Sequence, residues 1–85
     1  MDNVVDFSPV GWVPVSQLPG RYKIVKSVIY TRIKAVGVKP ERISVRAYVT
    51  DEQLALLDAL HEFIQGGGTT AEFIFFRGLG PEIEN

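Results

Sequence analysis

The side chains that could perform acid–base or metal chemistry are concentrated in one stretch, TDEQLALLDALHEFIQGGG, from Thr50 to Gly68. His61, the chain's single histidine, lies beside Glu62 and three residues after Asp58. Adjacent helical side chains point about 100° apart, so His61 and Glu62 do not converge on one metal ion, and adding Asp58 gives two ligands at most. The chain also has no cysteine to act as a nucleophile or zinc ligand. We therefore predict no enzyme, no metal site and no cofactor.

The same stretch has the features of an amphipathic helix. Thr50 and Gln53 match the T-x-x-Q capping box, in which each side chain bonds the other residue's backbone N–H. An apolar stripe at helical spacing follows, formed by Leu54, Leu57, Leu60, Phe63 and Ile64. Gly66 is placed to end the helix in a left-handed conformation. Asp51, Glu52, Asp58 and Glu62 then fall on the polar side, where we expect them to be solvated. The three glycines follow a helix, which excludes a phosphate-binding loop.

Three other segments have the composition of strands. RYKIVKSVIYTRIKAVG (Arg21–Gly37) is rich in β-branched and aromatic residues, and ERISVRAYVT (Glu41–Thr50) alternates apolar with polar side chains. The turn GVKP between them predicts an antiparallel hairpin. TTAEFIFFRG (Thr69–Gly78) is expected to be a third, aromatic strand. The predicted fold is α+β: a small antiparallel sheet of about three strands in β-β-α-β order, with one amphipathic helix packed on it.

The ends of the chain differ in composition from this α+β domain, which we assign to residues 21–80. Residues 1–20 contain three of the five prolines together with many apolar residues, and predict an extended arm that docks on its own domain or on a neighbouring subunit. Residues 81–85 form an acidic tail. Aromatic and aliphatic residues of the arm and of the aromatic strand are candidate interface anchors: Phe7, Trp12, Val13, Val15, Leu18, Phe73, Phe75 and Phe76.

Charge is unevenly distributed along the 85 residues, although the net charge is only −1. Eight of the nine basic residues lie between Arg21 and Arg46, with Glu41 as the one acid among them. A basic strand face is predicted from Lys26, Arg32, Lys34, Arg42 and Arg46, with Tyr22, Tyr30 and Tyr48 between them. Such a face could contact another protein subunit, or could bind nucleic acid by tracking phosphates and stacking bases. The N-terminus has two acids and no basic residue, and no apolar run reaches membrane-spanning length, so neither a signal peptide nor a membrane partner is expected.

The stretch KPERISVRAYVTDEQLALLDALHEFIQGGGTTAEFIFF resembles short tail proteins, of the minor-tail or tail-tip type, of tailed bacteriophages and prophages. The matching features are the strand Ile43–Val49, the segment Thr50–Gln53, the glycine pair Gly67–Gly68 and the aromatic strand, together with Leu54, Leu57, Phe63, Phe73 and Phe75. Those proteins usually continue with further sheet beyond the aromatic strand. We therefore expect a neighbouring copy or partner to cover the exposed sheet edge.

The resemblance implies a non-enzymatic structural protein of the virion tail, assembled in the host cytoplasm into a ring or larger complex. Its partners would be other copies of itself and other phage tail proteins, held by arm and sheet-edge contacts. Two alternatives remain open at the level of sequence. One is a small nucleic-acid-binding module that uses the basic strand face, and the other is a regulatory or antitoxin-like protein-binding domain.

Overall fold

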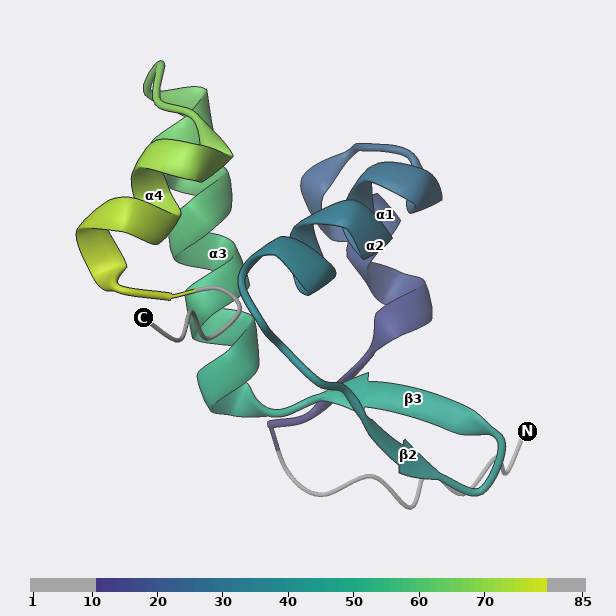
Figure 1. Cartoon of the computed structure of the whole chain (residues 1–85). Helices are drawn as coiled ribbons and strands as arrows, with labels where there is room; N and C mark the ends of the chain where they lie inside the picture. The colour runs from purple at the N-terminus through teal and green to yellow at the C-terminus, as the bar shows by residue number, and fades with distance from the viewer. Residues whose placement is uncertain (1–10, 80–85) are drawn as a thin grey trace.

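The chain folds into a three-stranded antiparallel sheet and four α-helices within residues 11–79, the part that the computed structural model describes (Figure 1). The predicted α+β class and three-stranded antiparallel sheet are confirmed. The elements are, in chain order, β1 (Val13–Pro14), a 3₁₀ turn η1 (Val15–Gln17), α1 (Leu18–Tyr22), α2 (Lys26–Ala35), β2 (Glu41–Ile43), β3 (Arg46–Val49), α3 (Asp51–Gln65) and α4 (Thr70–Arg77).

The strands that form the sheet differ from those predicted. The strand order is β1-β3-β2, so the segment 41–50 is itself a hairpin and not a single strand. Ile43 pairs with Arg46 across a two-residue loop, in which Ser44 takes a positive φ of 59°. The third strand comes from the predicted arm, where Val13 pairs with Val49 on the other side of β3. The predicted pairing of residues 21–37 with 41–50 is therefore wrong.

The predicted strand at 21–37 is helical in most of its length. Ile29 and Ile33, four residues apart, are both buried, and Val36 joins them just after α2 ends. A spacing of four is an even number and is also one helical turn, so it fits one face of a strand and one face of a helix equally well. Burial of these side chains against the rest of the core outweighs their β-propensity, which is strongly dependent on context.

The predicted helix after Thr50 is confirmed as α3. The backbone N–H of Gln53 donates to Thr50 Oγ1 (3.2 Å), and the N–H of Thr50 donates to Gln53 Oε1 (2.9 Å), which completes the capping box. The left-handed residue at the end is Gly67 (φ 106°), one position later than predicted. Its N–H bonds Ile64 O, and the next N–H, of Gly68, bonds Phe63 O, as in a Schellman motif.

The predicted aromatic strand at 69–78 is the helix α4. Thr69 caps it, because the Glu72 N–H donates to Thr69 Oγ1 (3.1 Å) while the Thr69 N–H donates to Glu72 Oε1 (3.0 Å). The sequence T-T-A-E contains this second capping box. In a helix only one side of the aromatic run faces the core, so Phe73 is buried while Phe75 and Phe76 are exposed.

One hydrophobic core joins all the helices to the sheet. Its fully buried side chains are Leu18, Leu60 and Val49, and α4 packs against both α3 and α2 (Figure 1). Val15 and Leu18 belong to this core, so residues 13–20 are part of the domain and do not form the extended arm that we predicted. The rest of the predicted arm, 1–10, and the tail, 81–85, lie outside the described residues. No helix within residues 11–79 is both long enough and apolar enough to cross a membrane.

Candidate interaction surfaces

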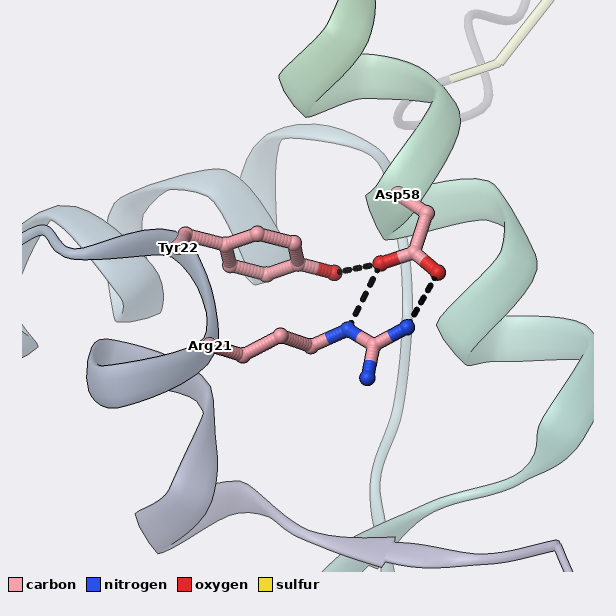
Figure 2. A network of polar contacts seen from close by, with 3 residues as sticks. All are labelled: Arg21, Tyr22 and Asp58. Carbon is pink, nitrogen blue, oxygen red and sulfur yellow. Dashed lines mark hydrogen bonds and ion pairs between the residues drawn. The ribbon is translucent and has the colours of Figure 1, made fainter.

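A hydrogen-bonded cluster joins α1 to α3 around the carboxylate of Asp58 (Figure 2). Arg21 donates from Nε to Asp58 Oδ1 (2.8 Å) and from Nη2 to Asp58 Oδ2 (2.6 Å), the two-pronged geometry in which arginine binds carboxylates most strongly. The hydroxyl of Tyr22 donates to the same Oδ1 at 2.6 Å. Asp58 therefore accepts hydrogen bonds from two residues of α1. Our prediction that it is a solvated acid on the outer side of the helix is wrong.

Burial and these contacts shift the pKa of all three groups. The hydrogen bonds from Arg21 hold the pKa of Asp58 below its usual range, and the bond from Tyr22 acts in the same direction. Burial raises the pKa of the Tyr22 phenol, and its hydrogen bond to Asp58 raises it further. The bond to Asp58 likewise raises the pKa of Arg21. Asp58 therefore stays ionised and Tyr22 stays neutral. Such fixed charge states suit a structural contact between α1 and α3 and not a proton-transfer site.

His61 continues this cluster towards α2. Its ring lies against that of Tyr22, with 4.7 Å between the centroids, and its Nδ1 is 3.1 Å from Arg32 Nη1. A guanidinium group only donates hydrogen bonds, so Nδ1 must accept and the ring proton must lie on Nε2. The Gln65 amide nitrogen lies 3.2 Å from Nε2, and rotating this amide by 180° supplies the acceptor oxygen that Nε2–H requires. Both ring nitrogens of His61 are then occupied by the protein.

A groove with basic sides lies between α2, the 3₁₀ turn and the β2–β3 hairpin. It consists of two adjoining pockets of about 360 and 240 Å³, which share Val15, Ser16 and Tyr30. Val15 and Ile29 supply buried apolar walls, and Tyr30 is 48% exposed at the boundary between the pockets. The charged residues that line the two pockets are Lys26, Arg42 and Arg46, and none of the lining residues is acidic. We call this surface the basic groove.

An exposed group of aromatic rings covers α4 and the end of α3. Phe75 and Phe76 are 80% and 71% exposed, with 5.7 Å between their ring centroids. The ring of Phe76 meets Phe63 edge to face at 6.3 Å, and Phe63 in turn packs on the buried Phe73 at 5.7 Å. We call Phe63, Phe75 and Phe76 the aromatic patch. Contiguous exposed aromatic rings of this kind mark interaction sites far more often than single exposed apolar residues do.

The basic groove and the aromatic patch belong to halves of opposite charge. Residues 11–50 contain eight basic residues and one acid, a formal charge of +7, and residues 51–79 contain one basic residue and five acids, a charge of −4. Glu62 and Glu72 are exposed on the same two helices as the aromatic patch. In Figure 1 α4 and the hairpin lie on different sides of the molecule, and the groove shares no lining residue with the surface around Phe63 and Phe76.

The structure separates the predicted interface anchors into three groups. Val15, Leu18 and Phe73 are buried in the protein's own core, so we reject them as anchors for a partner. Trp12 and Val13 are half-buried, Val13 within β1, and Phe7 lies outside the described residues. Phe75 and Phe76 remain as the exposed candidates.

The predicted basic face is brought together only in part. Lys26, Arg42 and Arg46 line one groove, although α2 contributes Lys26 from a helix and not from a strand. Arg32 contacts His61, and Lys34 is exposed on α2 outside the lining of the groove. Among the three tyrosines that we placed on this face, Tyr30 lines the groove, whereas Tyr22 and Tyr48 are buried.

Some residues of these surfaces were not predicted. Val45 is 81% exposed at the mouth of the groove, although the alternation of residues 41–50 places it on a buried strand face. The loop lacks the Asn-Gly or Gly-containing sequence that usually reveals a two-residue turn, so no local signal was available. The bond between Arg21 and Asp58 joins residues 37 positions apart, and only the opposite charges of the two halves hinted at it.

Comparison with protein families, with curated proteins and with solved structures finds no match to this chain. Within residues 11–79 no group of three or more histidine, aspartate or glutamate side chains is arranged to hold a metal ion. The candidate sites of this protein are therefore the basic groove and the aromatic patch.

Proposed function

We propose that this protein is a non-enzymatic structural component that assembles with copies of itself through the aromatic patch. The observation that carries the proposal is the exposure of Phe75 and Phe76, two neighbouring phenylalanines on a capped helix. Burying one such side chain stabilises a protein or complex by roughly 1.5–3 kcal/mol, so two exposed phenylalanines leave a large burial free energy unused. Burying Phe75 and Phe76 between copies would stabilise the assembly by this free energy.

The packing of α4 supports this interpretation. The core contact of the helix is already made by Phe73, on which Phe63 packs and over which the Arg77 guanidinium carbon lies 4.9 Å from the ring centroid. Phe75 and Phe76 are therefore additional to what the fold requires. Aromatic side chains dominate the energetics of protein interfaces, and a rigid helix presents them at little conformational cost.

The resemblance to short tail proteins suggests a bacteriophage tail as the setting for this assembly. The aromatic run that contributes to the resemblance is the same run that presents Phe75 and Phe76. The mode of contact that we propose is a helix surface, in place of the arm and sheet-edge contacts expected from sequence. The reason is that Val15 and Leu18, two anchors of the expected arm, are committed to the protein's own core.

Sedimentation velocity over a concentration series tests this function. We expect the wild-type chain to associate and the double variant Phe75→Ser/Phe76→Ser to remain a monomer with unchanged circular dichroism. Val25→Ser is the matched control: Val25 is 65% exposed, lies on neither surface and is the N-cap of α2, where serine is favourable. The proposal is overturned if the wild type is monomeric throughout, or if the double variant associates as the wild type does.

A second candidate function, binding of single-stranded nucleic acid, is favoured by one observation. Lys26, Arg42 and Arg46 line the basic groove together with Tyr30, and cations beside a stacking ring are the arrangement that non-specific single-strand binders use. Binding of a fluorescent oligonucleotide at low salt tests it. The affinity should fall steeply as salt is added, and Arg42→Gln/Arg46→Gln should reduce that dependence. An absence of binding at low salt rules this candidate out.

A further inference from the structure

We infer that the basic groove of one copy receives the aromatic patch of another, so that the copies join head to tail. This inference rests on the proposed function and adds to it the second half of the contact. It makes the occupant of the groove a second copy of this chain, and it predicts a head-to-tail arrangement of the copies.

The groove is large enough for aromatic rings, and its lining combines apolar and polar side chains. A cavity of about 150 Å³ lined by apolar side chains is large enough for benzene. The two pockets of the groove have volumes of about 240 and 360 Å³ and adjoin along Val15, Ser16 and Tyr30. Phe75 and Phe76 are two adjacent rings 5.7 Å apart. A pair of neighbouring pockets therefore matches a pair of neighbouring rings, and Tyr30 offers a third ring for edge-to-face contact.

The charges at the borders of the two surfaces are complementary. Lys26, Arg42 and Arg46 line the groove, and no acidic residue is among its lining residues. Beside the aromatic patch, Glu72 precedes Phe75 and Phe76 by three and four residues, a spacing that places it on the same side of the helix. Glu62 and Arg77 both line the shallow surface that includes Phe63 and Phe76, so with Glu72 the border of the patch carries two acids and one base. Opposite charges around an apolar centre favour this pairing over contact between two grooves or two patches.

The placement of the two surfaces sets the geometry of the assembly. They are built from different residues, with the hairpin and α4 on different sides of the molecule (Figure 1), so a contact between them is heterologous and leaves one free groove and one free patch on the dimer. Repeating such a contact builds a ring if the rotation closes and a filament if it does not. A contact between two patches would instead stop at a symmetric dimer.

Mixing two defective variants tests the inference. The patch variant Phe75→Ser/Phe76→Ser keeps its groove, and the groove variant Arg42→Glu/Arg46→Glu keeps its patch. We expect each to associate at least about tenfold more weakly than the wild type, because each has lost one side of the contact. Mixed together, they should form a 1:1 complex that does not grow further, measured by sedimentation velocity or native mass spectrometry. Lys34→Glu/Lys39→Glu changes the charge equally outside the groove and should associate as the wild type does.

The outcomes separate the inference from the function on which it rests. A wild type that stays monomeric overturns both. If the patch variant is monomeric but the groove variant associates normally, the patch binds elsewhere; the inference fails while the proposed function stands. If both variants are folded monomers but form no complex when mixed, head-to-tail docking is overturned as well. A groove variant that associates normally yet loses oligonucleotide binding assigns the groove to nucleic acid instead.

Discussion

Arg21 and Asp58 connect the basic and the acidic half of this chain through two hydrogen bonds of 2.8 and 2.6 Å between residues 37 positions apart. The same carboxylate accepts the hydroxyl of Tyr22, whose ring packs on His61. A single aspartate therefore fixes α1 against α3, and Pro19 of α1 lines the basic groove. The integrity of this contact can be tested separately from assembly.

Asp58→Asn should destabilise the fold by about 1–2 kcal/mol, measured by urea denaturation with Trp12 fluorescence as the probe. Asparagine keeps one acceptor oxygen but removes the charge that strengthens the bonds from Arg21 and Tyr22. We place the value at the lower end of the range for charged hydrogen bonds because the side chains of Arg21 and Asp58 are 42% and 32% exposed. Glu62→Gln, on an exposed position of the same helix, should change the stability by less than about 0.5 kcal/mol.

The stabilisation from Asp58 should disappear in acid. Its pKa is lower in the folded protein than in the unfolded chain, so its contribution is complete above the unfolded value of about 4 and is lost as the pH falls through the lower, folded pKa. The difference in unfolding free energy between the wild type and Asp58→Asn should therefore be constant near neutral pH and shrink below about pH 4. A difference that stays constant down to pH 2 would contradict the ion pair with Arg21.

Thr69→Ala should cost about 1 kcal/mol of stability, because it removes the acceptor for the Glu72 N–H at the start of α4. Thr70→Ala is the matched control one residue later, since Thr70 is the first helical residue and alanine is a better helix former. Chemical denaturation of the two variants compares them directly. Equal stabilities would show that residues 69–77 do not depend on the capping box. That result would be expected of a strand in this position, and it would contradict the helix.

Gly68→Ala should destabilise the protein by about 1–3 kcal/mol through steric overlap. A Cβ at position 68 would overlap the ring of Phe63, which supports both Phe73 and Phe76. Displacing that ring should also weaken self-association, so sedimentation velocity complements the denaturation experiment. Gly20→Ala is the control, because nothing lies within 4 Å of its added Cβ and alanine favours the helix α1. Loss of stability in Gly20→Ala alone would contradict this packing.

Local signals in the sequence were sufficient to predict α3 but not its neighbours. Around α3 the capping box at Thr50, the apolar stripe and the glycines all indicate the same helix, so the prediction succeeded. For α2 the spacing of the buried pair Ile29 and Ile33 fits both the strand period and the helix period. The β-branched composition favoured the strand, which was wrong. For α4 the capping box at Thr69 was present, yet the β-propensity of the aromatic run suggested a strand.

The two candidate surfaces were predictable to different degrees. Phe75 and Phe76 were named as interface residues, together with Phe73, because they were placed on an aromatic strand, but their exposure follows from the helical arrangement, which buries Phe73. Lys26 and Arg46 lie 20 positions apart, and only the turn between α2 and the hairpin brings them to one groove. Contacts of this kind depend on how elements pack, which periodicity within one element does not encode.

The shallow anchoring of α4 has a consequence for hydrogen exchange. The helix has eight residues and one buried side chain, Phe73, whereas α3 has fifteen residues and buries Leu57 and Leu60. Segments with few buried apolar contacts open locally at a lower free energy than the core does. The amide protons of α4 should therefore exchange before those of α3 in the monomer, and docking of the aromatic patch should bring the two helices to similar protection.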